Sequence, residues 1–209
     1  MKLNRVEKLL MNNPVRAALQ RHYEAPLFER LGGRLNGKRV LEIGCGRGVG
    51  TGIILERFGA AEVHACDIDP DMIQRARRRL VHYPEGRVLL GVGDATKLPQ
   101  PDGSFDAVFD FGIIHHVPDW RAAVAEIRRV LRPGGLFFFE EVTRQALDRW
   151  FSRSFLEHPR EDRFSAEELL AELEEQGIVV GDNFVERFLG DLVIGVGRRH
   201  SPPSTTATA

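Results

Sequence analysis

Acidic and glycine residues follow two apolar runs in the first third of the chain. Glu42 lies in the run 40–43, which leads into residues 44–48, GCGRG, and then into a helical pattern. Glycines let a backbone turn sharply and approach a ligand, while the start of a helix offers N–H groups without partners. Asp67 ends the next apolar run, at about the interval that places a carboxylate on the ribose hydroxyls of a nucleotide. The spacing predicts a site for a nucleotide-like cofactor; the alternative is a glycine-rich turn without a ligand.

The spacing of the glycines distinguishes between classes of nucleotide-like cofactor. The dinucleotide fingerprint Gly-x-Gly-x-x-Gly, read from Gly44, needs glycine at position 49, where the chain has Val49. NAD and FAD are therefore disfavoured, and a P-loop is excluded because the sequence has no GxxxxGK[ST]. Asp69 and Pro70 fit the N-cap and the first position of a helix, which predicts that Asp67 is left free for a ligand.

Composition excludes several classes of protein. The 209 residues are 43% hydrophobic and 28% charged, as in globular domains, and the net charge of -1 favours neither nucleic acid nor anionic lipid. The longest apolar runs are far shorter than the roughly 18 residues of a spanning helix. Cys45 and Cys66 lack zinc-like spacing, so no metal is expected, and the N-terminus lacks the pattern of a signal peptide. We expect one cytoplasmic domain without an integral membrane segment.

From residue 39 onward, short apolar runs alternate with longer amphipathic ones, which predicts a parallel sheet of βαβ units. Strands are expected at 39–43, 62–67, 87–92, 105–110 and 135–141. Helices are expected at about 48–58, 70–82 and 119–131. A close pair of β-like runs, 179–188 and 191–198, predicts an antiparallel hairpin at one edge of the sheet.

Helical patterns flank this core. Apolar spacing over residues 3–31 predicts two helices, the second of which begins at Pro14. Further helices are expected at about 147–157 and after Ser165, which has Glu168 three residues on as in a capping box. The C-terminal tail is rich in Ser, Thr and Pro and has nothing to bury, so we expect it to be disordered.

Four motifs occur in an order and spacing that resemble a known family: VLEIGCGRGVGT, ACDIDPDM, GDATKLPQPDGSFDAVFDFGIIHHV and RVLRPGGLFFFEE. They are similar to those of class I S-adenosylmethionine-dependent methyltransferases, particularly the small-molecule branch with the ubiquinone and menaquinone methyltransferases. The resemblance covers residues 36–141 and hardly touches 143–178. It implies an α/β, Rossmann-like, seven-stranded and mostly parallel sheet with an antiparallel edge strand, helices on both faces and an N-terminal helical lid. Residues 1–36 would be the lid, 37–199 the S-adenosylmethionine-binding domain and 200–209 the tail.

The resemblance also implies roles for single residues toward the methionine and ribose parts of S-adenosylmethionine. The backbone at Gly44, Cys45 and Gly46 is expected to hold the methionine portion. Glu42 is expected near the amino group, because an ammonium gains from a nearby carboxylate. Asp67 is expected to bind the ribose hydroxyls.

Other residues are expected at the two ends of the cofactor. Ile68 and Met72 are expected to pack on the adenine, Asp94 to accept from its amino group, and Ala95 to donate its backbone N–H to the ring. Tyr23 is expected to reach the methionine carboxylate. The alternative interpretation is that its aromatic ring only packs between helices.

Acidic and histidine residues lie where the fourth and fifth strands are expected to end, which is where such sheets place their crevice. By resemblance, Asp110 is expected to face the methionine end of the cofactor. Glu141 is our candidate for a catalytic acid or base. The alternative interpretation is a structural carboxylate that forms an ion pair with Arg144 or another arginine. His115 is the second catalytic candidate; for it and His116 a structural role is at least as well supported.

The implied activity is transfer of a methyl group from S-adenosylmethionine to a small molecule by in-line displacement. Because the sulfonium already activates the methyl group, alignment and exclusion of water matter more than a strong acid or base. Alternatives are a non-catalytic binding or regulatory protein of the same fold and a related aminopropyl-type transferase. Arginines at 75–79 and 128–129 fit solvated helix faces, so no nucleic-acid partner is expected. The sequence indicates no oligomeric state.

Overall fold

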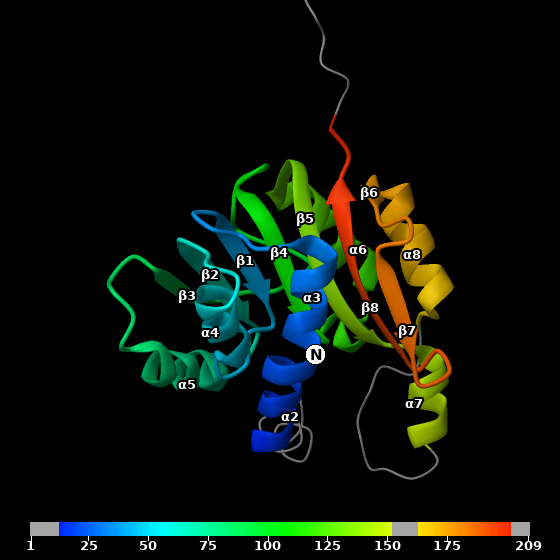
Figure 1. The fold of residues 1–209 in the computed structure, drawn as a ribbon, viewed down its shortest axis with the longest axis horizontal. Helices are drawn as coiled ribbons and strands as arrows, with labels where there is room; N and C mark the ends of the chain where they lie inside the picture. The colour runs from blue at the N-terminus through cyan, green and yellow to red at the C-terminus, as the bar shows by residue number, and fades with distance from the viewer. Residues whose placement is uncertain (1–12, 152–162, 202–209) are drawn as a thin grey trace, which may run out of the picture.

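A computed structural model describes residues 13–151 and 163–201, the side chains of 148–151 excepted. One mixed sheet runs through it, with strand order β3-β2-β1-β4-β5-β8-β6 and β7 paired to β8 (Figure 1). Its strands are β1 Arg39–Ile43, β2 Glu62–Asp67, β3 Val88–Val92, β4 Phe105–Phe111, β5 Leu131–Val142, β6 Ile178–Val179, β7 Phe184–Arg187 and β8 Leu192–Arg199. The first five strands are parallel, and β8 runs antiparallel to β5. The predicted α/β Rossmann-like fold is therefore confirmed.

The antiparallel edge differs in detail from the prediction. The expected strand at 179–188 is two strands, β6 and β7, because a turn that Asn183 closes onto the carbonyl of Val180 interrupts it. Both pieces pair with β8, so the sheet has eight strands rather than seven. The predicted hairpin is the β7–β8 pair.

Helices cover both faces of the sheet. On one face lie α3 (Ala25–Gly32), α4 (Val49–Glu56) and α5 (Pro70–Leu80), and on the other α6 (Trp120–Val130) and α8 (Ala166–Glu175) (Figure 1). Each face has its own apolar cluster, as expected for a parallel sheet buried on both sides. This arrangement leaves the carboxyl ends of the parallel strands as the edge where a ligand can enter.

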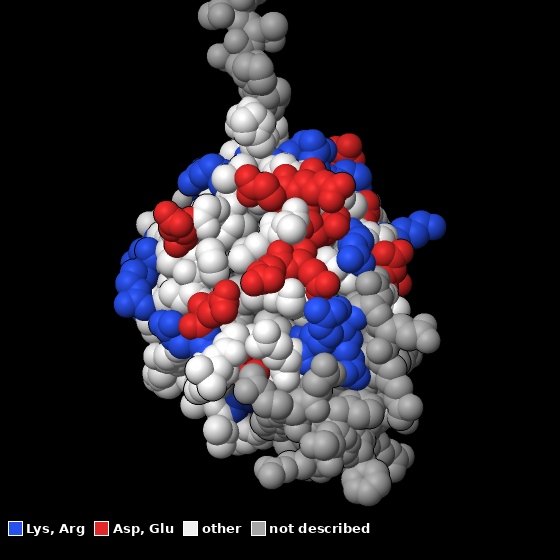
Figure 2. All heavy atoms as spheres, turned by 90° about the vertical axis from the view of Figure 1, so that its right-hand side faces the viewer, with Lys and Arg blue, Asp and Glu red and all other residues white. Residues whose placement is uncertain are grey.

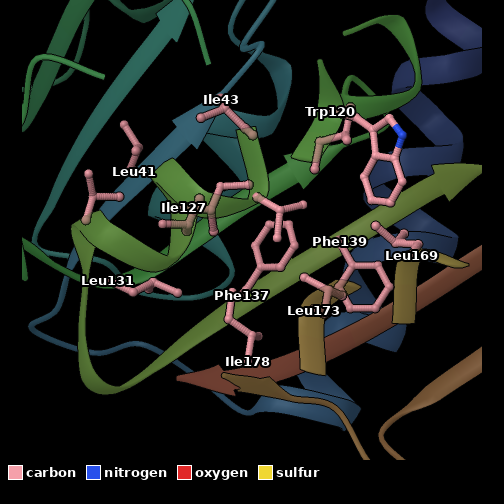
Figure 3. Packing of buried hydrophobic residues seen from close by; sticks show 14 of the residues in the cluster. Leu41, Ile43, Trp120, Ile127, Leu131, Phe137, Phe139, Leu169, Leu173 and Ile178 are labelled. Atoms are coloured by element: carbon pink, nitrogen blue, oxygen red, sulfur yellow. The ribbon is translucent and has the colours of Figure 1, made fainter. Parts of the chain in front are cut away.

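Successive phenylalanines of β5 show how the two clusters are separated. Side chains alternate across a strand, so Phe137 and Phe139 pack with α6 and α8, as Figure 3 shows. Phe138 points to the other face, where its ring stacks on Phe109 at 4.2 Å between centroids and meets Phe28 of α3 edge-on at 5.8 Å. Full burial of such a side chain contributes about 1.5–3 kcal/mol.

The helix starts agree with the sequence signals. Asn13 caps α2 (Pro14–Leu19), with Pro14 as its first residue. Asp69 caps α5, and Ser165 forms the expected capping box with Glu168 at the start of α8. Helix α4 is shorter than predicted, because Gly48 has a left-handed conformation (φ 80°) and precedes the helix.

Two further boundaries were predicted wrongly. Helix α6 ends at Val130 and β5 begins at Leu131, four residues before the predicted start, so that the Arg-Pro-Gly segment lies within the strand. Helix α7 (Arg144–Phe151) begins three residues before the predicted helix at 147–157, of which residues 152–157 lie outside the described part.

The N-terminal helices are only partly described. Helix α2 continues through one π-helical turn, Gln20–Glu24, into α3, instead of forming one regular helix to residue 31. The helix predicted over the first residues, and most of the tail predicted to be disordered, fall within 1–12 and 202–209 and lie outside the described residues. Within the described part, no helix is long and apolar enough to cross a bilayer.

Candidate functional site

A cavity of about 330 Å³ opens at the carboxyl ends of β1, β2 and β4. Residues that the sequence predicted for the cofactor form much of its wall: Glu42, Gly44, Cys45, Gly46, Asp67, Ile68, Met72, Asp94 and Ala95. As far as described residues form it, the wall does not include the other predicted site residues: Tyr23, Asp110, His115 and Glu141. The structure therefore brings together the predicted site residues at the ends of β1, β2 and β3. The predicted residues at the ends of β4 and β5 do not line the cavity.

The glycine turn after β1 forms the floor of the cavity. Gly44 and Gly46 have positive φ values of 64° and 52°, which glycine adopts without strain. A Cβ on Gly44 would lie 2.3 Å from Cγ2 of Ile113, so a side chain there would collide with the residue after β4. The backbone can consequently come into direct contact with a ligand in the cavity.

Glu42 is buried at the end of β1 and faces this cavity. The hydroxyl of Thr51 donates to its Oε2. Burial, together with the charges of Asp67 and Asp110, raises the pKa of Glu42 to about 8, although the bond from Thr51 acts in the opposite direction. Without a cation beside it, Glu42 is mostly protonated at neutral pH, and a cationic ligand group would stabilise its carboxylate.

Gly50 in α4 leaves the space that Glu42 occupies. A Cβ there would lie 2.1 Å from Glu42 Oε1 and 2.7 Å from the ring of Phe111, whereas a Cβ on Gly52 would meet nothing closer than 3.7 Å. We expect Gly50→Ala to lower the free energy of unfolding by about 1–3 kcal/mol through overpacking. Gly52→Ala is the matched control in the same helix and should raise it by about 0.5–1 kcal/mol. Urea unfolding of both variants measures the difference, and equal stabilities would contradict this packing.

Asp67 ends β2 at the edge of the cavity. Its Oδ2 accepts from the backbone N–H of Gly46 at 2.9 Å, and its Oδ1 accepts from that of Asp69 at 2.8 Å. Asp67 is therefore not the cap of α5, as predicted, but its carboxylate already has backbone partners, because it ties the glycine turn to the residue that caps α5. The prediction that Asp69 caps α5 is confirmed, since its Oδ1 accepts from the N–H of Asp71 at 3.0 Å.

The opposite end of the cavity is formed by the residues predicted for adenine. Met72 is buried, and Ile68 is 37% exposed. Asp94 Oδ1 accepts from the backbone N–H and the hydroxyl of Thr96, and these bonds keep the pKa of Asp94 below its usual value. Asp94 is thus an ionised acceptor at this end, held by its own turn.

The sequence interpretation missed the contribution of α2. Arg16, Ala17 and Gln20 line the cavity from this helix, which lies across the carboxyl ends of the strands (Figure 1). The guanidinium of Arg16 donates to Glu24, to Glu140 Oε2 at 3.0 Å and to the carbonyl of Phe111 at 3.4 Å. These bonds join α2 to the ends of β4 and β5.

Two buried acids, Glu24 and Glu140, contact the guanidinium of Arg16. Burial and the neighbouring Glu140 raise the pKa of Glu24, although Arg16 acts in the opposite direction. Pro14 predicted the helix start, but no local signal identified Arg16 as the residue that contacts β4 and β5.

Tyr23 lies away from the cavity. It is 37% exposed, and its hydroxyl accepts from Nε of Arg187 at 2.9 Å, which joins the N-terminal helices to β7. The π-helical turn at Gln20–Glu24 adds a residue to the helical repeat, so a regular helical pattern cannot predict which side of the helix Tyr23 takes. Its alternative interpretation, an aromatic between elements, agrees with this placement.

The two catalytic candidates form a buried pair. Nδ1 of His115 lies 2.6 Å from Glu141 Oε2, and the carboxylate of Glu141 also accepts from the backbone N–H groups of Ile114 and His115 at 2.7 and 3.1 Å. Burial raises the pKa of Glu141 to about 7, although hydrogen bonds with the side chain of Asp110 and with the backbone N–H groups of Ile114 and His115 lower it. Arg144, the alternative partner, instead pairs with Glu168 at 3.5 Å.

Asp110 completes this group from β4. It is fully buried, accepts from the N–H of Ile113 at 2.8 Å, and has its pKa raised well above the usual value by burial and by Glu141. His116 rather than His115 lines the cavity. The roles of Asp110, His115 and Glu141 remain predictions.

The described residues offer neither a metal site nor a reactive thiol. In residues 13–151 and 163–201, no group of three His, Cys, Asp or Glu side chains is placed to hold a metal ion. Cys45 and Cys66 are buried free thiols, and burial raises the pKa of both. Neither thiol is activated as a nucleophile, because the thiolate is the reactive form.

Comparisons with known proteins agree with the motifs. A family model described as a methyltransferase domain matches residues 41–139. The chain is 40% identical over 124 residues to a malonyl-[acyl-carrier protein] O-methyltransferase of Halorhodospira halophila, a match covering 59% of this chain and 41% of that protein. It is 40% identical over 107 residues to a fatty-acid O-methyltransferase of Mycolicibacterium smegmatis, covering 51% and 38%.

The fold has solved counterparts. A crystal structure of a SAM-dependent methyltransferase from Aquifex aeolicus superposes with a TM-score of 0.72, at 22% identity over 94% of this chain and 98% of that one. At this identity the similarity shows the fold alone. The chain spans less than half the length of the two curated relatives named above.

Proposed function

We propose that this chain, which is similar to a methyltransferase domain over residues 41–139, is a class I S-adenosylmethionine-dependent methyltransferase and that it methylates a small-molecule acceptor. The observation that carries the proposal is the single cavity that unites the glycine turn, the buried Glu42 and the carboxylate of Asp67. The relatives act, by their names, on a malonyl-carrier protein and on fatty acids, which supports an acceptor of low molecular weight or a small group on a carrier.

The cavity fits S-adenosylmethionine in size and in chemistry. Its volume of about 330 Å³ lies within the usual range of ligand pockets. Glu42 offers a carboxylate to the ammonium, Gly44 and Gly46 allow the backbone to approach, and Asp67 offers acceptors to the ribose hydroxyls. When bound, S-adenosylmethionine supplies a methyl group already activated by a sulfonium.

The chain's own residues position the reactants and exclude water. Helix α2 closes the cavity from above through Arg16, so we assign a lid role to the N-terminal segment. We propose that His115 contacts the acceptor and that Glu141 acts through it, by holding Nδ1 so that the other edge of the ring faces away from β5. Alignment of the acceptor then provides most of the rate, and Glu141 is a positioning residue.

The proposed environment and partners follow from the same features. Buried thiols without a disulfide fit a reducing cytoplasm. Exposed acids gather over α8, on the face that Figure 2 shows, and such a surface repels polyanions: Glu167, Glu168, Glu174 and Glu175. We therefore propose a small-molecule acceptor and no nucleic-acid partner.

Calorimetric titration tests the cofactor directly. We expect S-adenosylmethionine and S-adenosylhomocysteine to bind with micromolar dissociation constants and NADH not to bind, because the glycine spacing lacks the dinucleotide pattern. Failure of the first two ligands to bind would contradict the proposal. Binding without methyl transfer to any acceptor in a broad screen would instead favour a non-catalytic binding protein.

A further inference from the structure

Strand β3 forms the edge of the sheet opposite to β6. In the described part of the chain it pairs only with β2, and Figure 1 shows it at the left-hand margin of the sheet. Its five residues, VLLGV, include no charged residue and no proline. Native edge strands are usually protected by lysine, proline or a bulge, because an unprotected edge can pair with another strand. The residues of β3 supply none of this protection.

Every second residue of β3 directs its backbone N–H and C=O away from the sheet. Directly after the strand, the N–H of Gly93 donates to the carbonyl of Asp67 at 3.1 Å, so the odd-numbered residues bond to β2. The even-numbered residues face outward: Val88, Leu90 and Val92. Among the described residues, no strand or loop pairs with the backbone of these three.

The face of β3 that is turned away from α5 is uncovered. Val88 and Leu90 pack with the apolar cluster on the α5 side, so Leu89 and Gly91 point to the opposite face. There Leu89 is 43% exposed, and a Cβ on Gly91 would meet nothing within 4 Å. The strand thus presents a bulky apolar side chain and an open position two residues apart.

These features are self-complementary in one register of antiparallel pairing. When Leu90 pairs with Leu90 of a second copy, the two residues exchange both backbone bonds. Val88 of each copy then pairs with Val92 of the other, so every outward N–H and C=O of β3 is bonded. Leu89 lies opposite Gly91 of the second copy, in the space that Gly91 leaves open. A shift by one residue misaligns the backbone groups, and a shift by two separates Leu89 from Gly91.

The charges at the ends of the strand agree with this pairing. In the same register Arg87 of one copy faces Gly93 of the other, beside Asp94. Arg87 donates to the carbonyls of Ala60 and Ala61 and has no acid partner among the described residues, whereas Asp94 is ionised. Opposite charges therefore approach at both ends, and the net charge of -1 gives two copies little overall repulsion.

We propose that β3 is a dimerisation edge and that its partner is a second copy of this chain, paired antiparallel about Leu90. One sheet then continues through both copies, related by a two-fold axis, and the same residues serve on each side. Because β3 leads directly into Gly93 and Asp94, which line the cavity, the second copy lies beside this end of each site. The inference does not rest on the proposed function, since assembly is measured without cofactor or acceptor.

Sedimentation velocity of the full chain between about 1 and about 200 μM tests the dimer. We expect a concentration-dependent change from monomer to dimer, with a dissociation constant on the order of 10 μM, because a single strand pair makes a small interface. Hydrogen exchange locates the contact. The outward amides of Val88, Leu90 and Val92 should exchange about fivefold more slowly at the high concentration, and the amides of Leu89 and Gly91, which bond to β2, should not change.

Two variants test the register. Gly91→Val fills a position that is open in the single chain, so the fold should be retained, but it takes the space of Leu89 from the second copy. Leu89→Lys places a charge in the contact. Each should raise the dissociation constant by roughly tenfold or more while the melting temperature at low concentration stays near that of the wild type.

Val179→Lys is the matched control, because Val179 is 45% exposed and lies on β6, the opposite edge strand. It should dimerise like the wild type. A protein that stays monomeric over the whole concentration range would overturn the proposal. A dimer that keeps its affinity in both Gly91→Val and Leu89→Lys, or one that Val179→Lys weakens instead, would place the contact elsewhere and overturn it as well.

Discussion

Replacing Asp67 by alanine is expected to lower the affinity for S-adenosylmethionine about 100-fold. Hydrogen bonds to a charged group contribute about 1.5–3 kcal/mol each, and a ribose offers two hydroxyls to this carboxylate. The same carboxylate holds the N–H groups of Gly46 and Asp69, so alanine also loosens the turn that must contact the methionine portion. Calorimetric titration with S-adenosylhomocysteine measures the loss.

Two variants separate this effect from a general loss of charge. Asp67→Asn retains one oxygen acceptor and should lose only about tenfold in affinity. Asp102→Ala removes an acid whose side chain is 81% exposed and which pairs with Arg129, away from the cavity, so it should bind like the wild type. Wild-type affinity in Asp67→Ala, with an unchanged melting temperature, would show that the ribose does not lie at this carboxylate.

The parallel core was predictable because its signals are local. Strands buried on both faces read as short apolar runs, and the helices between them begin at Asp69–Pro70 and Ser165 with side chains that cap their first N–H groups. The cofactor wall followed from the same logic, since residues at the carboxyl ends of adjacent parallel strands must lie on one edge. Glu42 and Asp67 are the clearest instances.

Features that depend on tertiary contacts were not predictable. Arg16 faces the cavity because it is bonded to Glu140, 124 residues later in the chain. Tyr23 lies within the π-helical turn, so its side does not follow the regular helical repeat. Glu141 was expected at the mouth of the site, but it is buried, and its carboxylate accepts from the backbone N–H groups of Ile114 and His115.

Buried acids are a recurring property of the site. Glu24, Glu42, Asp110 and Glu141 all have pKa values raised by burial. A raised pKa means that the folded chain keeps a proton that the unfolded chain has lost, so each such group lowers stability as pH rises. For Glu42 the window runs from 4.5 to about 8, at up to about 1.4 kcal/mol per pH unit. A bound cation can recover this energy, which links cofactor binding to proton release.

We expect the affinity for S-adenosylhomocysteine to rise about 50-fold between pH 6 and pH 8. Only the carboxylate form of Glu42 attracts the ligand's ammonium, and a pKa of about 8 leaves that form a small minority at pH 6. The apparent affinity is reduced by this fraction, so it increases as pH approaches the pKa and then levels off. Titration in buffers of different ionisation enthalpy should show close to one proton released per ligand bound at pH 7.

Glu42→Gln provides the control, because glutamine resembles the protonated acid and retains the contact with Thr51. This variant should bind weakly at every pH, release almost no proton, and be more stable than the wild type above pH 8. S-adenosylhomocysteine is used because it has the ammonium but no sulfonium, which assigns the proton to the methionine end. Equal proton release by the wild type and Glu42→Gln would assign the titration to Asp110 or Glu141, and Glu42 would then not be the partner of the ammonium.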